Sequence, residues 1–514
     1  MILVLAGVAY FFQKALAATG GTFFYTLDDP YIHLSLAENI RAGHYGINVG
    51  EVASPSSSIL YPFLLAGLMF LGAGSWGPLI LNLIGAAGLA WVFAGLLFDA
   101  FADEGGQLTR PDPIVLLPFS FLAIHAFGLP LNGMEHTLHV WVSLAIVAGL
   151  LALDRRDGVP LALVVAIIAA PLLRFEGAAL AFAAIAVLTW QRRFSAAATA
   201  AVVVIVCIAS YVVSMWALGL PPLPSSVLTK HETAAAILGD GSVSPLLPLF
   251  LQLFVDLQEP QPTHLLIAIC LLVLAITRTK KHSKTERGTT FAISIAAAAH
   301  FLFGDYGWRG RYEIYIFASL ISILFILYRD FFKQNTRFPI LKTTATCLII
   351  LTVGFSNIIY LFQTPAASHN IFNQQYQMHR FSTEFYDRPV AANDIGYLSY
   401  QNDVYLLDLW GLGSEQARQM RADGDMTSEE IGQITIKNGI AYAMVYEEWF
   451  SGSLPESWCR LAILETSRVS VAIGSVVFYL IDMTEEQAFR TALTEFEPTL
   501  PAAANLTIYP SCDS

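Results

Sequence analysis

The sequence has few charged residues. Asp, Glu, Lys and Arg make up 13% of its 514 residues, 55% are hydrophobic, and the mean hydropathy is +0.57. This composition excludes an ordinary soluble protein. The chain also lacks a basic surplus: residues 365–514 contain 20 Asp or Glu against 8 Lys or Arg, and they account for the whole formal charge of -12. Because nucleic acid and anionic surfaces attract positive charge, we expect no nucleic-acid partner.

Several catalytic and metal-binding signatures are absent from the sequence. It contains no HExxH, GxSxG, P-loop or zinc-ligand spacing. Its histidines near the predicted loops, including His33, are better explained as loop or interface residues than as metal ligands. Of five cysteines, three lie in apolar runs, and Cys459 and Cys512 lie in the acidic tail, where an oxidising location would permit a disulfide between them.

Apolar runs of nearly membrane-spanning length recur from Met1 to about Phe362. Clusters of Lys and Arg between these runs mark cytoplasmic loops by the positive-inside rule. Working outward from the clusters predicts about eleven transmembrane helices, with the N-terminus in the cytoplasm and the C-terminus outside. The predicted crossings are 1–17, 77–98, 114–129, 136–153, 159–173, 177–190, 197–218, 263–277, 289–304, 313–328 and 340–362. The lipid bilayer is therefore an expected partner.

The same parity argument defines a long first outer loop at 19–76. The apolar run 58–71 cannot be a further crossing, and we expect it to be an interfacial or re-entrant helix. The proline-split run 246–258 is interpreted in the same way. As an alternative, 1–17 could be a cleaved signal peptide, although no basic segment precedes it.

Two adjacent aspartates, Asp28 and Asp29, stand at the start of a predicted helix in this loop. Asp29 can cap the helix with Pro30 at its first position, and Gly43 can end it. A helix entrance favours an ionised carboxylate, as a general base requires. A plain helix cap explains one of the aspartates equally well. Either carboxylate could also hold a divalent cation, and no other cofactor is expected.

The remaining outer loops hold charged residues between apolar runs, where a charge is costly unless it has a role. Glu135 and His136 occupy one loop, and Arg174 and Glu176 the next, with ion pairing of Arg174 to Glu176 or Glu135 as the structural alternative. The other candidates are Lys230 in a proline-rich loop, and Asp305, Arg309, Arg311 and Tyr312 in a loop where guanidinium groups could meet a lipid phosphate. Interfacial anchoring by Trp308 and Tyr312 is the alternative there.

The order of these motifs resembles the GT-C superfamily of membrane glycosyltransferases that use polyprenyl-phosphate sugars. The chain is most similar to the group of the terminal arabinofuranosyltransferase of the mycobacterial cell wall. The resemblance extends over most of the chain and rests on Asp28-Asp29 with Asn39, Gly133-Met134-Glu135, Arg174-Phe175-Glu176-Gly177, Pro224 to Lys230, and Asn393-Asp394-Ile395-Gly396 with Asp408-Leu409-Trp410-Gly411-Leu412.

The resemblance implies an inverting transfer of a hexosyl or pentosyl group from a polyprenyl-phosphate donor to a cell-envelope glycan or lipid acceptor, at the outer (periplasmic) face of the bacterial inner (cytoplasmic) membrane. Asp28 or Asp29 would deprotonate the acceptor hydroxyl, and Arg309, Arg311, Arg174 and Lys230 would bind the donor phosphate. The implied sugar or acceptor ligands are Glu135, Glu176, His33, Asn39, Asp305 and Tyr312. A membrane transporter or lipid flippase with an outer sensor domain is the alternative function.

The expected fold is an α-helical polytopic membrane protein with a C-terminal extracytoplasmic α/β domain. We place a GT-C-like catalytic domain at 1–364 and the soluble domain at 365–514. Strands are expected near 389–392, 404–408, 441–446, 461–466 and 474–481, with helices near 414–422 and 427–438. Asp394 to Tyr397 and Glu447 to Phe450 could hold a glycan acceptor, and turns and core aromatics explain them equally well.

Overall fold

The computed structural model describes residues 1–102, 108, 111–155, 157–228, 260–278, 282–334, 337–422, 424 and 426–513. The chain divides into two compact units. The first consists of Met1–Phe11, Pro78–Ala209 and Gly241–Gln363, and the second of Phe12–Gly77, Ser210–Asp240 and Thr364–Ser514. Residues 12–77, which contain the whole predicted first outer loop, therefore belong to the same unit as the C-terminal domain.

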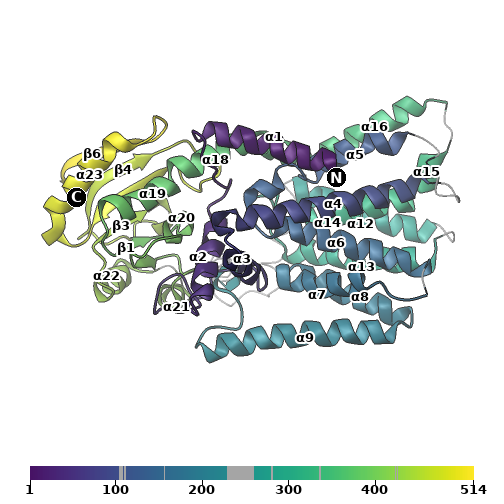
Figure 1. Ribbon diagram of the computed structural model, residues 1–514, viewed down its shortest axis with the longest axis horizontal. Coiled ribbons are helices and arrows are strands. Elements are labelled where there is room, and N and C mark those ends of the chain that lie inside the picture. The colour runs from purple at the N-terminus through teal and green to yellow at the C-terminus, as the bar shows by residue number, and fades with distance from the viewer. Residues whose placement is uncertain are drawn as a thin grey trace, which may run out of the picture. The chain divides into compact units, whose positions relative to one another are not determined.

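The first unit is helical (Figure 1). Its elements are α1 (Ile2–Ala18, in part), α4 (Gly77–Phe101), α5 (Asp112–Ala123), α6 (His136–Leu151), α7 (Leu161–Leu173), α8 (Gly177–Trp190), α9 (Phe194–Ala217, in part), α12 (Pro260–Arg278), α13 (Lys284–Phe303), α14 (Ile314–Leu327), α15 (Arg329–Lys333), α16 (Pro339–Val353) and α17 (Phe355–Phe362). α6 packs against α7 and α14, and α8 packs against α7 and α13. The predicted helices are confirmed at all eleven apolar segments.

Only some of these helices are long and apolar enough, by themselves, to cross a membrane. Within the described residues, Gly74–Phe101, His136–Asp154 and Phe194–Ala217 are long and apolar enough to span a bilayer. α16 and α17 meet the same criterion together, but they are bent by 67° at Gly354. There, a β-carbon would lie 2.2 Å from Cα of Ala123, so the close approach of α5 requires glycine. The predicted number of eleven crossings remains a prediction.

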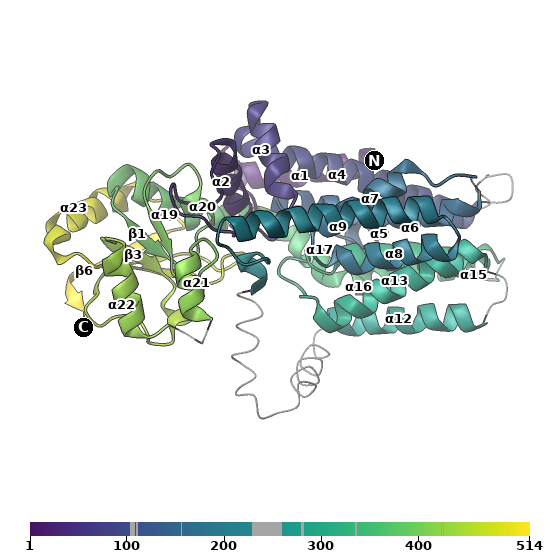
Figure 2. The same cartoon turned by 90° about the horizontal axis from the view of Figure 1, so that it is seen from below.

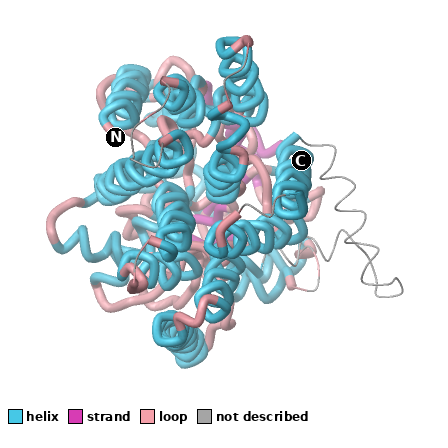
Figure 3. The backbone as a smooth tube through the Cα atoms, turned by 90° about the vertical axis from the view of Figure 1, so that its right-hand side faces the viewer, coloured by secondary structure: helices cyan, strands magenta, loops and turns pink. Residues whose placement is uncertain are grey.

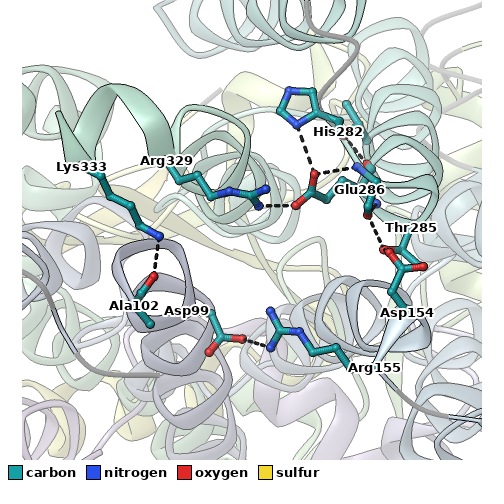
Figure 4. A network of polar contacts seen from close by, with 11 residues as sticks. Asp99, Ala102, Asp154, Arg155, His282, Thr285, Glu286, Arg329 and Lys333 are labelled. Atoms are coloured by element: carbon teal, nitrogen blue, oxygen red, sulfur yellow. Dashed lines mark hydrogen bonds and ion pairs between the residues drawn. The ribbon is translucent and has the colours of Figure 1, made fainter. Parts of the chain in front are cut away.

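Polar contacts join the predicted cytoplasmic loops at one end of these helices (Figure 4). The side chain of Glu286 lies between His282 and Arg329 and contacts both. Ser283 and Glu286 form a reciprocal capping box that begins α13. Hydrogen bonds and ion pairs between specific side chains therefore hold these loops in place.

The second unit is built around a six-stranded sheet with the order β2-β1-β3-β5-β4-β6. The strands are β1 (Val390–Ala392), β2 (Leu406–Asp408), β3 (Tyr442–Val445), β4 (Cys459–Glu465), β5 (Ser475–Leu480) and β6 (Asn505–Asp513). β1 runs parallel to β2 and β3, and the other pairs are antiparallel. The five predicted strands are confirmed, and β6 was not predicted.

Helices cover both faces of this sheet, whose strands Figure 3 colours magenta. On one face, Tyr442 and Met444 pack against α19 (Gln375–Arg380) and α23 (Glu486–Phe496). On the other, Ala443 and Val445 pack against α21 (Glu415–Arg421) and α22 (Ser428–Lys437); α22 lies beside β1 and β3 in Figure 2. Successive residues of one strand thus serve two cores, as a sheet covered on both faces requires. The predicted α/β domain is confirmed.

The second unit also contains α2 (Asp29–Arg41), α3 (Tyr61–Phe70), α18 (Thr364–Asn373) and α20 (Gly396–Ser399). α3 is the helix predicted at 58–71, whereas the run 246–258 lies outside the described residues. Cys459 is disulfide-bonded. The side chain of Cys512 lies outside the described residues, so its predicted pairing with Cys459 remains a prediction.

Candidate functional site

The paired aspartates stand at the entrance of α2, but their capping role differs from the prediction. The N-cap is Asp28, not Asp29, which is the first residue of the helix, and Pro30 follows within the first turn. The Asp28 side chain makes no capping hydrogen bond. The predicted cap at Asp29 is therefore wrong, and a plain helix cap does not explain Asp28, because its carboxylate is engaged elsewhere.

The Asp28 carboxylate instead accepts two backbone hydrogen bonds from a segment about 370 residues further along the chain. Gly396 N–H donates to Oδ2 at 2.6 Å, and Tyr397 N–H donates to Oδ1 at 2.8 Å. A β-carbon at position 396 would lie 2.3 Å from the Asp28 carboxyl, so only glycine permits this approach. The two N–H groups belong to the start of α20 and fix the orientation of the carboxylate.

This contact lies at the carboxyl end of β1, at a topological switch point. β1 lies between its parallel neighbours β2 and β3, so the connection after β1 leads to one side and the connection after β2 returns to the other. In open parallel sheets, ligands bind in the crevice that such a reversal leaves at the carboxyl ends of the strands. Asn393 and Asp394 follow β1 directly, and Tyr446 follows β3.

A polar network surrounds the carboxyl end of β1. Tyr446 N–H donates to Asn393 Oδ1 at 2.9 Å, and the Tyr446 hydroxyl lies 2.8 Å from Asp394 Oδ2 and 2.6 Å from Gln374 Oε1. Gln375 Nε2 donates to Asp394 Oδ2 at 3.0 Å. Asp394 lies two residues before Gly396, whose N–H donates to Asp28, and is close enough for its charge to act on the Asp28 carboxyl. Residues of α2, α19, β1 and β3 therefore converge on two carboxyl groups.

The environment of the two carboxyls favours protonation. Burial raises the pKa of Asp28 well above its usual range, and the negative charge of Asp394 raises it further, against the opposing effect of Tyr397 N–H. Burial also raises the pKa of Asp394, although hydrogen bonds from Tyr446 and Gln375 oppose it. Both residues are only half-buried.

The Asp408-Leu409-Trp410-Gly411-Leu412 segment follows the adjacent strand β2. Asp408 accepts hydrogen bonds from Trp410 N–H at 2.8 Å and Gly413 N–H at 2.7 Å. Burial nevertheless raises its pKa to about 6. Trp410 packs on Trp449 at a centroid distance of 4.5 Å, and Arg421 lies 3.9 Å over its ring. Asp408 therefore shapes a loop that presents aromatic surface.

The other predicted residues of the first outer loop make local contacts. Buried His33 lies 3.1 Å from Ser56 Oγ and packs edge-on against Tyr61. Asn39 donates to Gly46 O at 2.7 Å, which holds the end of α2. These contacts account for both residues structurally, and their predicted role as sugar ligands stays a prediction.

In the helical unit, the loops that contain Glu135 and Arg174 meet through an ion-pair network. Arg174 Nη1 bonds to Glu135 Oε1 at 2.9 Å, and Arg174 Nη2 bonds to Glu176 Oε1 at 2.5 Å. The Glu135 side chain is completely buried. Tyr312 lies beside this network, with Arg174 and Arg311 5.6 and 4.9 Å from its ring centroid. The structural ion pairing considered for Arg174 is therefore present with both carboxylates.

The predicted phosphate loop, 305–313, contains four successive residues with left-handed backbone. The φ angles are 73° at Gly307, 40° at Trp308, 65° at Arg309 and 62° at Gly310. Trp308 and Arg309 pay a steric penalty in this conformation, which persists only when the surroundings hold it. Here Glu313 Oε2 accepts the Gly307 N–H at 3.1 Å.

Arg309 is buried in this loop and only partly satisfied. Its Nη2 donates to Tyr360 O at 2.9 Å, while Nε and Nη1 have no hydrogen-bond partner among the described residues. Its guanidinium lies 5.7 Å from the centroid of Tyr360. A buried guanidinium with unused N–H groups suits an anionic ligand. Arg311 donates to the Tyr312 hydroxyl at 2.9 Å, and Asp305 is exposed.

Two predicted features, Lys230 and a divalent-cation site, are not among the contacts described above. Lys230 lies outside the described residues. Within the described part of the chain, no group of three or more His, Cys, Asp or Glu side chains could hold a metal ion. The divalent cation considered at Asp28 or Asp29 stays a prediction.

Sequence reasoning gave Asp394 no catalytic role and did not identify Gln375, Tyr446 or Tyr360. Asp394 had a detectable signal, since an acidic residue directly after a strand and before glycine marks a strand-end loop. Gln375, Tyr446 and Tyr360 had none, because each acts through a contact that only the tertiary structure creates.

Comparisons with known proteins identify the fold. A domain of unknown function (DUF8728) matches residues 369–480. Comparison with curated proteins gives no match. The structure of ArnT from Cupriavidus metallidurans bound to undecaprenyl phosphate is similar with a TM-score of 0.51 and 11% identity, over 94% of this chain and 98% of that chain.

Two other structures are less similar. Apo ArnT from Cupriavidus metallidurans has a TM-score of 0.49 and 10% identity, over 94% of this chain and 98% of that one. The oligosaccharyltransferase AglB from Archaeoglobus fulgidus, in complex with an inhibitory peptide and a dolichol-phosphate, has a TM-score of 0.42 and 12% identity, over 92% and 75%. The predicted fold class is confirmed: the chain shares its fold with ArnT and combines apolar helices with a C-terminal α/β domain.

Proposed function

We propose that this protein is a glycosyltransferase that moves a sugar from a polyprenyl-phosphate donor to a hydroxyl of a cell-envelope glycan or lipid. The observation that carries the proposal is Arg309, a buried guanidinium with two N–H-bearing nitrogens that lack a partner in the described chain. A phosphate supplies the oxygens and the negative charge that such a group needs. The GT-C fold, shared with a protein bound to undecaprenyl phosphate, supports the lipid-linked form of that phosphate.

The proposed reaction is a single inverting displacement. Asp28 or Asp29 takes the proton of the acceptor hydroxyl, the acceptor oxygen attacks the anomeric carbon, and the bond to the phosphate oxygen breaks. The polyprenyl phosphate leaves with the electron pair. Because charge grows on this leaving group, preorganised cations contribute most in the transition state.

The roles of the cations differ in this proposal. Arg309 and Arg311 bind the donor phosphate, whereas Arg174 is already neutralised by Glu135 and Glu176 and orients them. Lys230, in the proline-rich loop, remains a proposed phosphate ligand. Glu135, Glu176, Asp305, Tyr312, His33 and Asn39 are the proposed hydroxyl ligands of the sugar or acceptor.

The proposal places the protein in the bacterial inner membrane, with its N-terminus in the cytoplasm and 365–514 in the periplasm. Alkaline phosphatase fused after residue 400 should be active, and a fusion in the loop near Arg193 should be inactive. The reverse pattern would move the phosphate loop to the cytoplasmic side and contradict this topology.

The direct test uses membranes that contain the protein and radiolabelled polyprenyl-phosphate pentose or hexose. Donor consumption should require the wild-type protein and should fall at least about 100-fold in Asp28→Asn or Asp29→Asn, whichever residue is the base. Asp387→Asn is a matched control, because its side chain is 76% exposed in the same domain. If neither aspartate variant loses turnover, the base assignment is wrong.

The same preparation tests the alternative function. A transporter or lipid flippase would move a labelled lipid-linked sugar across sealed vesicles without breaking its sugar–phosphate bond. Translocation of intact donor, with no labelled acceptor formed, would replace the proposed transferase by a flippase.

A further inference from the structure

The C-terminal domain contributes a carboxyl group to the site that contains Asp28. Asp394 directly follows β1 and lies two residues before Gly396, whose N–H donates to Asp28 Oδ2 at 2.6 Å, so the two carboxyls are neighbours. The two acids come from opposite ends of the sequence and meet at the switch point of the sheet. Two ionised carboxylates in contact repel each other, so such a pair holds one proton more tightly than either acid would alone.

The hydrogen bonds around Asp394 are consistent with an additional proton. The Tyr446 hydroxyl lies 2.6 Å from Gln374 Oε1 and 2.8 Å from Asp394 Oδ2. A phenol has one proton to donate. If the Tyr446 hydroxyl donates its proton to Gln374, its contact with Asp394 needs a second proton, and a proton held by the carboxyl pair can supply it.

Asp28 also retains capacity to accept a substrate proton. A carboxylate offers about four lone-pair positions. Gly396 N–H and Tyr397 N–H occupy two of them, at 2.6 and 2.8 Å. When Asp394 is ionised, positions remain on Asp28 for the proton of an acceptor hydroxyl, and these N–H groups keep the carboxylate aimed.

We infer that Asp394 is a positioning residue for Asp28, that Asp28 rather than Asp29 is the general base, and that the pair holds the proton removed from the acceptor. This inference rests on the proposed glycosyl transfer. As the acceptor oxygen bonds to the anomeric carbon and polyprenyl phosphate departs with its electron pair, the hydroxyl proton passes to Asp28 and is shared with Asp394. Release of that proton to water restores the base.

The groups facing Asp28 come from four elements. Asp29 and Tyr31 belong to α2, Asp394 follows β1, Tyr397 belongs to α20 and Tyr446 follows β3. Of these, Asp394 adds the largest charge effect to the pKa of Asp28, and Asp29 adds less. Removing the Asp394 charge should therefore lower the pH at which Asp28 ionises.

The first measurement is the pH dependence of donor consumption by detergent-purified full-length protein. A base acts only when ionised, so the wild-type rate should fall on the acidic side through the raised pKa of Asp28. In Asp394→Asn this limb should move by about one pH unit toward lower pH. In Asp29→Asn it should move less, and in Asp387→Asn it should stay in place. An unmoved limb in Asp394→Asn would overturn the inference.

The second measurement does not require activity. Because the pKa of Asp28 is raised in the folded state, the folded protein binds more protons than the unfolded chain, and stability falls as pH rises above the ordinary Asp value of roughly 4. As the pH rises from 4.5 to 8, the thermal midpoint of wild type should therefore fall more than that of Asp394→Asn. Parallel curves would refute the pairing of the two carboxyls.

The two measurements separate the possible failures. If wild-type protein consumes no donor but the stability curves converge as expected, the carboxyl pair is real and the proposed glycosyl transfer is wrong. If donor is consumed and Asp29→Asn abolishes turnover while Asp28→Asn does not, the transfer stands and the assignment of Asp28 as base is wrong.

Discussion

At the scale of single residues, charge pairing separates structural cations from cations available to a ligand. Arg174 has two carboxylate partners, and the Glu135 side chain among them has no exposed surface. Arg309 is equally buried, but two of its nitrogens lack partners among the described residues. The two arginines looked alike in the sequence, since each stands in an outer loop between apolar runs. Their contacts predict opposite effects of substitution.

Arg174→Gln should destabilise the protein by about 3 to 5 kcal/mol, because it removes the ion-pair partner of two carboxylates, one of them completely buried. Thermal unfolding of the purified protein in detergent measures this loss. Arg155→Gln is the control, since Arg155 pairs with Asp99 at an exposed position and should change stability by only about 0 to 1 kcal/mol. Equal effects of the two substitutions would contradict the buried network.

Arg309→Gln should leave the thermal midpoint within a few degrees of wild type, because the Arg309 guanidinium makes few hydrogen bonds that the substitution can remove. The same change should raise the KM for the polyprenyl-phosphate donor at least about tenfold, since a charge-assisted phosphate contact is lost. Titration of the rate with donor measures the KM, and Arg41→Gln, at the exposed end of α2, serves as the control. Destabilisation without a change in KM would make Arg309 structural.

At the scale of elements, the entrance of α2 is held from outside the helix. Its N-cap side chain bonds to the start of α20 rather than to its own first turn. Buried Ser35, further along α2, donates to Ser399 O at 3.0 Å. The helix therefore docks on α20 along its length, and Gly396 is the point of closest approach.

Gly396→Ala should weaken this docking, because the added carbon would lie 2.3 Å from the Asp28 carboxyl. Overpacking of this kind costs about 1 to 3 kcal/mol, and it should also reduce donor consumption by displacing the carboxylate. Gly432→Ala is the matched control: the nearest heavy atom to its added carbon is 3.8 Å away, and alanine is the better helix former in α22. Both thermal midpoint and turnover should be unharmed by the control.

At the scale of the whole chain, residues 12–77 and the C-terminal domain belong to one compact unit. Ile32 and Ile47 are buried in the same hydrophobic core as Phe381, Tyr442 and Phe478. Burial of one isoleucine side chain contributes about 1.5 to 3 kcal/mol. Two such residues are a large share of the 5 to 15 kcal/mol by which a typical domain is stable.

Residues 364–514 alone should therefore be less stable than the same segment joined to 19–77 by a flexible linker. The expected difference is about 3 to 6 kcal/mol from the two isoleucines. Urea unfolding followed by circular dichroism compares the two proteins. A linked protein carrying Ile32→Ala and Ile47→Ala should fall back toward the stability of the fragment. Equal stability of fragment and linked protein would show that the domain needs no loop.

The sequence by itself determined the helical segments, the α/β character of the C-terminal domain, and the positions of the candidate residues in loops between apolar segments. Each follows from local patterns: apolar runs near bilayer length, strand-like runs between turns, and charges flanked by apolar segments. Those patterns are properties of neighbouring residues and need no tertiary contact. β6 was not predicted from the sequence. It lies beyond the last predicted strand and pairs with β4, and which strands pair depends on contacts between distant residues.

The tertiary structure alone decided how the candidate residues are used. It directed the Asp28 side chain away from its own helix, gave Arg174 two partners, left Arg309 with unused N–H groups, and brought Asp394 to Asp28. Each of these outcomes depends on groups distant in sequence, and a carboxyl or guanidinium takes its chemistry from the charges and N–H groups that surround it after folding. That dependence is why composition and spacing could name the candidates but could not assign their partners.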